Sequence, residues 1–202
     1  MINHPLFTNV ELKHYKKQLN ITTYKKNTLI FQEGEICNSL GLILSGELTI
    51  STLTNYDKEY IIDVLHPNDI FGENLLFNQN NIFLGDGIIS KDAEIIFISK
   101  DTLIELFKDK NFLTNYLFIV SSKTLKLRER LKLLSQKSVE EKIMFYLLNE
   151  YKKTGNPNIK IKSKEQLANI LNLPRPSLSR ELIKMQEKGL IKYDRYFITL
   201  VV

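Results

Sequence analysis

Residues 163–189 constrain the fold of this chain more than any other stretch, because they predict two short helices joined by a tight turn. Ser163 and Gln166 form a capping-box pattern, so we expect the first helix to begin there. Pro174 follows the end of that helix, and Pro176 opens the second one, since proline is tolerated in the first turn of a helix. This arrangement matches the helix-turn-helix, whose second helix enters the major groove of DNA.

Each of these two helices is expected to have one apolar face. Apolar residues recur at three- and four-residue intervals, which places them on one side of a helix. We expect this side to pack into a core and the opposite side to be free for DNA. The predicted inner residues are Leu167, Ala168, Ile170 and Leu171 in the first helix and Leu178, Leu182, Ile183 and Met185 in the second.

The charge of the chain is divided unevenly along its length. Residues 1–111 carry a net charge of −5, whereas residues 112–137 and residues 138–202 carry +5 each. A basic C-terminal part that contains the helix-turn-helix is typical of a nucleic-acid-binding protein rather than of a membrane-surface protein. Two of the five arginines, Arg175 and Arg180, fall on the predicted second helix, where a guanidinium group can pair with O6 and N7 of guanine.

The composition argues against several other classes of protein. No run approaches the roughly 20 apolar residues of a membrane span, and no signal-peptide pattern is present, so we expect a cytoplasmic protein. The single cysteine, Cys37, excludes an internal disulfide and an iron–sulfur cluster held by several thiolates of one chain. The three histidines and the cysteine stand far apart and outside any phosphate-binding glycine loop. We therefore predict neither an enzyme nor a metal site.

The first of three predicted parts comprises residues 1–111. Its beginning, residues 1–26, has an apolar stripe that predicts a mainly helical segment. From residue 28 to about residue 98, short apolar runs alternate with Gly, Asn, Asp and Pro every ten residues or so, which is the pattern of a β-barrel or sandwich. The turns between these runs are expected to contain Gly34, Gly46 and Gly72. A short helix is predicted over residues 101–107.

The second part, residues 112–137, predicts one long helix with a strict seven-residue repeat. A narrow apolar seam of this kind favours a parallel coiled coil with a second copy over burial within one domain. Thr124 is the polar position of the seam and either sets its register or is merely tolerated. The predicted seam residues are Leu113, Leu117, Val120, Thr124, Leu127, Leu131 and Leu134.

The third part, residues 138–202, surrounds the helix-turn-helix. A helix is predicted from residue 138 to residue 150, and a short strand from residue 159 to residue 162. After the motif, residues 190–202 alternate as two strands, which predicts the β-hairpin wing of a winged helix.

This order of elements resembles the catabolite activator protein family of bacterial regulators, the CRP/FNR group, over essentially the whole chain. The resemblance implies an α+β fold: a cyclic-nucleotide-binding-like β-roll (a double-stranded β-helix or jelly roll), a dimerisation helix and a winged helix-turn-helix. It also implies a homodimeric transcription regulator that binds a two-fold symmetric operator and contacts RNA polymerase. The residues that carry it are Phe31, Glu33, Gly34, Ser45, Gly46, Glu47, Asp69, Ile70, Phe71, Gly72, Glu73 and residues 177–191.

The chain departs from the family's cyclic-nucleotide pattern at the phosphate site. Phe83 and Leu84 stand where nucleotide-binding members have Arg followed by Ser, and no arginine occurs between Met1 and Ser122. Because a buried phosphate without a cationic partner is costly, we predict no tight cAMP binding. Glu73 matches the ribose-binding carboxylate and is either a ligand contact or structural.

Two readings of the effector pocket are left open. Either an apolar or weakly polar effector fits it, or side chains fill it and the protein needs no effector. The candidate pocket residues are Phe71, Gly72, Glu73, Phe83, Leu84 and Leu127. Haem would need axial ligands from His4, His14, His66 or Cys37, and their spacing does not point to haem.

We expect DNA to be read by the second motif helix. The candidate base-reading residues are Arg175, Ser177, Ser179 and Arg180, and the candidate phosphate contacts are Ser163, Lys164, Lys192 and Arg195. Pro176 stands where family members often place a glutamate, so their half-site sequence does not carry over. The sequence thus favours a sequence-specific DNA-binding regulator controlled by an effector other than cAMP or by none. The alternative is a β-roll binding module that acts through protein contacts, with a degenerate helix-turn-helix.

Overall fold

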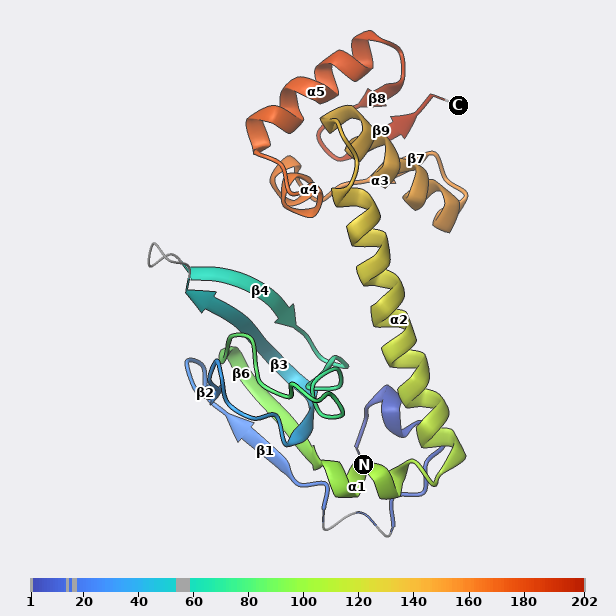
Figure 1. Ribbon diagram of the computed structural model, residues 1–202. Coiled ribbons are helices and arrows are strands. Elements are labelled where there is room, and N and C mark those ends of the chain that lie inside the picture. Colours follow the sequence, from blue (N-terminus) through green and yellow to red (C-terminus); the bar gives the residue numbers. More distant parts are fainter. Residues whose placement is uncertain (1, 14, 16–17, 54–58, 202) are drawn as a thin grey trace. The chain divides into compact units, whose positions relative to one another are not determined.

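The computed structural model describes residues 2–13, 15, 18–53 and 59–201. The chain divides into two compact units, Met1–Ser122 and Lys123–Val202. The first unit contains a β-roll, and the second contains the end of a long helix, three further helices and a small sheet (Figure 1). The predicted α+β class is therefore confirmed.

The first unit is built on an antiparallel sheet in which two long strands, β3 and β6, lie side by side (Figure 1). The main path of the sheet is β1-β6-β3-β4; β2 also pairs with β6, and β5 also pairs with β3. The strands are β1 (Ile21–Tyr24), β2 (Leu29–Phe31), β3 (Ser39–Leu53), β4 (Glu59–Leu65), β5 (Ile70–Phe71) and β6 (Asp86–Ser99).

Two of the predicted short runs are joined into a single strand. The apolar runs at residues 42–44 and 48–50 both belong to β3, so Gly46 lies within a strand and not in the predicted turn. Gly46 has a φ of 83°, and the pairing of β3 with β6 shifts register on both sides of it. A Cβ atom at this position would lie 2.2 Å from the carbonyl oxygen of Asp92. The glycine therefore allows a bulge that bends the strand without ending it.

The prediction of a mainly helical start is wrong. Residues 1–26 form one 3₁₀ turn, η1 (Pro5–Phe7), and the strand β1 within the described residues. Leu6 and Phe7 are buried among the side chains of the first unit. The side-chain amide of Asn115 donates to the carbonyl oxygens of Leu6 and Thr8, and that of Asn111 donates to Asn9. These bonds satisfy carbonyls that a helix would have paired internally, so the apolar residues are buried by an irregular segment.

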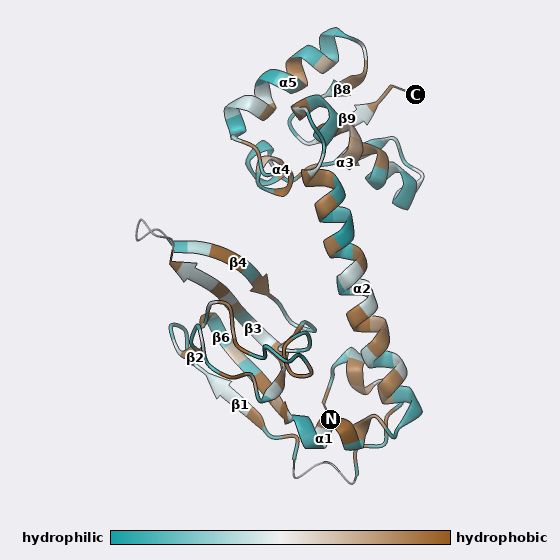
Figure 2. Ribbon diagram, viewed as in Figure 1, coloured by the Kyte–Doolittle hydropathy of each residue, from teal (hydrophilic) through white to brown (hydrophobic). Residues whose placement is uncertain are grey.

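Two helices follow the sheet, as predicted. α1 (Lys100–Leu106) begins at Ser99, whose hydroxyl accepts from the N–H of Thr102. α2 (Lys110–Leu134) begins in the first unit and ends in the second, and its first turns bury Phe112 and Tyr116. Apolar and polar bands alternate along α2 (Figure 2). No helix among the described residues is long and apolar enough to cross a membrane.

The predicted seam of α2 is largely uncovered within this single chain. Leu113 and Val120 are half-buried, and the other five seam positions are exposed. Leu117, Leu127 and Leu131 each leave more than half of their surface accessible. A row of exposed leucines at coiled-coil spacing is what a helix needs to pair with a second copy.

The second unit is a winged helix-turn-helix, as predicted. α3 begins with a capping box between Ser138 and Glu141 and ends at Gly155, which has a φ of 69°. The small antiparallel sheet has the order β7-β9-β8, and its β8-β9 hairpin is the wing (Figure 1). The elements are α3 (Val139–Thr154), β7 (Asn158–Lys160), α4 (Lys164–Leu171), α5 (Arg175–Glu187), β8 (Ile191–Tyr193) and β9 (Phe197–Leu200).

His4 is a buried titratable group in the first unit. Its side chain is 4% exposed, and its Nδ1 accepts from the N–H of Leu6 at 3.1 Å, which caps η1. Within the described part of the chain, its Nε2 has no hydrogen-bond partner. Burial lowers the pKa of His4 from its usual 6.5, against the smaller opposing influence of Asp69.

We expect His4 to make the protein less stable in mild acid. The unfolded chain binds a proton at His4 near pH 6.5, whereas the folded chain binds it only at lower pH. The part of the unfolding free energy that depends on neutral His4 is therefore complete above pH 6.5 and declines as the pH falls below it. His4→Asn keeps a capping oxygen and should reduce the loss of unfolding free energy between pH 7.5 and pH 5.5, measured by urea denaturation. The same pH dependence in His4→Asn and the unmodified protein would contradict the expectation.

Candidate nucleic-acid interface

The first motif helix, α4, begins at Ser163 as predicted. The Ser163 hydroxyl accepts from the N–H of Gln166 at 3.0 Å. The reciprocal half of the predicted capping box is absent: Gln166, although within the described residues, does not return a bond to Ser163. Leu167, Ala168 and Leu171 are buried and hold α4 against the rest of the unit.

A groove in the second unit brings several predicted DNA contacts together. It has a volume of about 580 Å³ and lies where the start of α4, the start of α5 and the wing meet. Four cationic side chains and one carboxylate line it, so its walls are strongly positive. We call it the basic groove; it is lined by Lys162, Ser163, Lys164, Arg175, Tyr193, Asp194, Arg195 and Tyr196.

The predicted DNA-contact residues do not all lie in the basic groove. Ser163, Lys164, Arg175 and Arg195 all line the basic groove. Lys192 lines a different hollow, of about 250 Å³, formed by the wing and Asn158. A phosphate backbone lying along the basic groove would meet several positive charges.

Two tyrosines on the wing support the cations of the groove. The Nζ of Lys164 lies 4.6 Å from the centre of the Tyr193 ring, and the guanidinium carbon of Arg195 lies 5.5 Å from that of Tyr196. A cation over an aromatic face is attracted by the ring and is held in place without losing its charge. Sequence reasoning missed both tyrosines and Lys162. The interleaving of aromatic and basic residues over positions 192–196 was the signal that could have found the tyrosines.

The carboxylate of the groove is engaged in the wing itself. Oδ1 of Asp194 accepts from the N–H groups of Tyr196 and Phe197 at 2.7 and 2.8 Å. The N–H of Asp194 in turn donates to the carbonyl of Phe197. Asp194 therefore forms the hairpin turn that presents Arg195 and Tyr196 at the groove.

The rotation of α5 is set by three buried side chains, those of Leu178, Leu182 and Met185. At about 100° per residue, the opposite face carries Pro176 and Arg180, which are exposed. The Nε of Arg180 donates to the carbonyl of Pro176 at 3.4 Å, so its side chain lies back toward the start of the helix.

Three residues of α5 differ from the prediction. Ile183, expected on the inner face, is half exposed, because the helical repeat carries it past the edge of the buried side. Ser177 and Ser179, expected on the outer face, are half-buried and lie on the two flanks of the helix. Lys184 lies on the outer face beside Arg180 and was not predicted.

The interior of the β-roll is packed with aromatic rings. Phe31 and Phe83 stack with their ring centres 3.8 Å apart, and Phe71 lies 5.6 Å from Phe31. Glycines make room for these rings. A Cβ atom at Gly41 would lie 2.0 Å from the Phe71 ring, and one at Gly87 would lie 2.4 Å from the Phe31 ring.

Only some of the predicted effector-pocket residues come together here. Phe71 and Phe83 belong to one apolar cluster with Phe31. Leu84 is 67% exposed and lies outside that cluster, and Leu127 belongs to the second unit and is also exposed. Leu84 therefore does not pack with Phe71 and Phe83, and its role at an effector pocket stays a prediction.

Glu73 lies in the turn that follows Gly72, a buried glycine with a φ of 82°. Burial, with a smaller contribution from the charge of Glu73, raises the pKa of Tyr116 to about 12. The carboxylate of Glu73 therefore lies near the first turns of α2. Cys37, in the same region, is buried, and its Sγ donates to the carbonyl of Ser39 at 3.4 Å.

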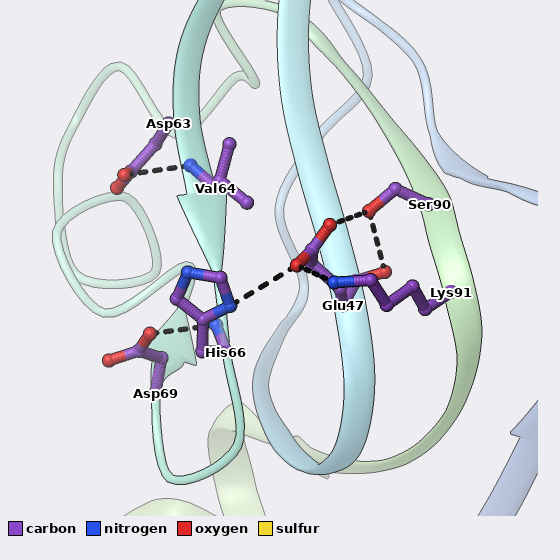
Figure 3. Close-up of polar contacts among 7 residues, drawn as sticks. All are labelled: Glu47, Asp63, Val64, His66, Asp69, Ser90 and Lys91. Atoms are coloured by element: carbon purple, nitrogen blue, oxygen red, sulfur yellow. Dashed lines mark hydrogen bonds and ion pairs between the residues drawn. The ribbon is translucent and has the colours of Figure 1, made fainter. Parts of the chain in front are cut away.

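Glu47 is the centre of a polar cluster on the β-roll (Figure 3). Its Oε2 lies 2.6 Å from Nζ of Lys91 and 3.4 Å from Nδ1 of His66, and its Oε1 accepts from the hydroxyl of Ser90 at 2.8 Å. The hydrogen bond from Lys91, followed by that from Ser90, lowers the pKa of Glu47. Glu47 thus connects β3 to β6 and to the turn after β4.

His14, another candidate haem ligand, lies outside the described residues.

Comparison with known proteins gives matches to both units. Residues 21–110 match the family model of the cyclic nucleotide-binding domain, and residues 141–201 match that of the Crp-like helix-turn-helix domain. The chain is 26% identical over 177 residues to an anaerobic regulatory protein of Bacillus subtilis. The matched region covers 84% of this chain and 74% of the relative. It is 21% identical over 189 residues to the cyclic AMP receptor protein of Thermus thermophilus, covering 93% and 85% of the two chains.

Solved structures share the fold. The crystal structure of Thermus thermophilus catabolite activator protein matches with a TM-score of 0.55 and 18% identity, over 97% of this chain and 93% of that one. The matched elements include both the β-roll and the winged helix-turn-helix, because the match runs over nearly the whole of each chain.

Lys164 should behave as a phosphate contact. We expect Lys164→Gln to weaken binding to all DNA duplexes by a similar factor and to reduce the slope of log K against log salt concentration by about 0.9, as loss of one phosphate contact predicts. Fluorescence anisotropy with two unrelated duplexes at several salt concentrations measures both effects. Lys152→Gln, at an exposed lysine of α3 outside the basic groove, is the matched control. A salt slope unchanged by Lys164→Gln would contradict this role.

Proposed function

Because the chain belongs to the CRP/FNR family of DNA-binding transcription regulators, we propose that two copies of it bind a two-fold symmetric operator in double-stranded DNA. Each copy reads one half-site with α5. Contact with RNA polymerase is part of the same proposal and follows from the family resemblance. The function is regulatory, and we assign the chain no catalytic step.

The basic groove is the observation that carries this proposal. It joins the N-termini of α4 and α5 to the wing and presents Lys162, Lys164, Arg175 and Arg195 on one surface. A DNA backbone that crosses this surface meets cations on both sides of the start of α5. The same placement directs the exposed face of α5, with Arg180, toward the base edges of the adjacent major groove. A β-roll module that acts only through protein contacts would have no need of such a surface.

The seam of α2 supports the dimer. Pairing of two α2 helices through their exposed leucines would duplicate α5 about a two-fold axis. Two recognition helices related in this way meet successive major grooves about 34 Å apart. The operator is therefore expected to consist of two inverted half-sites about one helical turn apart.

Arg180 is expected to read a guanine, and Arg195 to contact a phosphate. Arg180→Ala should cost about 1–3 kcal/mol of binding free energy and relax the preference at one base pair in each half-site, because a bidentate arginine–guanine contact contributes about that much. Arg195→Ala should weaken all sequences alike and leave the base preference unchanged. Selection of preferred sites from random duplexes, followed by gel shifts at two salt concentrations, compares the variants. Uniform weak binding of the unmodified protein to every fragment would refute the proposed function.

The β-roll is proposed to work without a cyclic nucleotide. Phe83 stands in the sequence where nucleotide-binding members of the family have their phosphate-binding arginine, and its ring stacks on that of Phe31. The packing of these rings against each other supports a regulator that needs no effector. An apolar effector that displaces a ring is the second possibility, and haem and iron–sulfur clusters are not part of the proposal.

Titration with cAMP tests this point directly. We expect isothermal calorimetry of the full chain to give no saturable heat at micromolar cAMP, because an unpaired phosphate diester loses its hydration without gaining a cationic partner. The cyclic AMP receptor protein of Thermus thermophilus serves as the comparison under the same conditions. Saturable micromolar binding would show that the Phe83 region accepts a nucleotide after all.

A further inference from the structure

The outer face of α5 carries one large apolar side chain, that of Ile183. It is 50% exposed, whereas the other large apolar residues of this helix, Leu178, Leu182 and Met185, are fully buried. An isoleucine at such a position buries only half of its surface and has a lower helix propensity than the lysine or glutamate that usually stand there. Half of this apolar side chain is therefore left on the surface that faces away from the core.

Ile183 lies next to the residue proposed to read a guanine. It follows Arg180 by three positions, so the two side chains are neighbours on the helix surface. Three residues advance a helix by roughly 4.5 Å, and base pairs are spaced about 3.4 Å along DNA. When Arg180 meets a base edge, Ile183 comes to lie over a base pair one or two steps away.

The chemistry of the major groove offers one apolar partner for such a side chain. Each base pair presents hydrogen-bond donors and acceptors there, and only thymine adds a methyl group, on C5. The isoleucine side chain can neither donate nor accept a hydrogen bond, so contact with a donor or acceptor would leave that group unsatisfied. Contact with a thymine methyl group removes apolar surface of both partners from water.

We propose that Ile183 is a specificity-determining residue that packs against the C5-methyl group of a thymine one or two base pairs from the guanine read by Arg180. The proposal rests on the proposed function, since it requires α5 to enter the major groove. It adds a preference for thymine at one position of each half-site, through the one apolar group that a base presents in the major groove.

Uracil provides the sharpest test, because it differs from thymine only by the methyl group. Preferred duplexes are first selected from random DNA with the full-length protein. Each thymine of the selected half-site is then replaced by deoxyuridine, one position at a time, and binding is measured by fluorescence anisotropy. We expect the affinity of the protein for the duplex to fall about fourfold when one particular thymine of each half-site is replaced. This factor corresponds to the loss of one buried methyl group.

Variants assign that loss to a side chain. Ile183→Ala should bind thymine and uracil equally at this position, and Ile183→Val should retain most of the difference. Ile170→Ala, at a partly exposed isoleucine of α4, is the matched control and should keep the full effect. Thermal unfolding should give similar midpoints for the Ile183 variants and the unmodified protein, because the side chain is half exposed.

The outcomes separate this proposal from the one on which it rests. Two results would overturn the role of Ile183 and leave the proposed function intact. One is a preferred sequence in which no thymine is sensitive to replacement by uracil, and the other is an unchanged sensitivity to uracil in Ile183→Ala. A selection that yields no preferred sequence would overturn the proposed function and the role of Ile183 with it.

Discussion

Burial of Leu178, Leu182 and Met185 is the constraint on which the DNA-binding surface depends. These three side chains fix the rotation of α5 about its own axis, because turning the helix would expose them to water. Once the inner face is fixed, the helical repeat decides the outer one. Arg180 and Ile183 therefore point away from the core, and the three side chains that cause this are buried and have no proposed contact with DNA.

The basic groove shows how cations of like charge are held close together. Lys164 and Arg195 lie over the rings of Tyr193 and Tyr196, and Asp194 shapes the turn between the two tyrosines through backbone hydrogen bonds. The aromatic rings orient the cations without neutralising them, so their charge remains available to phosphates. Under the proposed function, affinity for DNA comes largely from the groove and is salt-dependent, whereas base preference comes from the outer face of α5.

The β-roll matches the cyclic nucleotide-binding domain and has an interior packed with aromatic rings. Its long strands bend at the Gly46 bulge, and Glu47 beside it connects neighbouring strands through Lys91 and Ser90. Gly46 and Glu47 are thus accounted for by the architecture of the sheet. Phe83 stacks on Phe31, so an apolar ring is part of the aromatic cluster inside the β-roll.

The sequence by itself determined the order of the elements, the cap at Ser163, the seven-residue repeat of α2 and the lack of arginine in the β-roll. These are local or periodic properties, which neighbouring residues decide. Only the tertiary structure showed that the first residues form an irregular segment, since their carbonyls are satisfied by Asn111 and Asn115 from a distant helix. It alone assembled the basic groove and placed Ile183 on the outer face, because both depend on contacts between segments far apart in the chain.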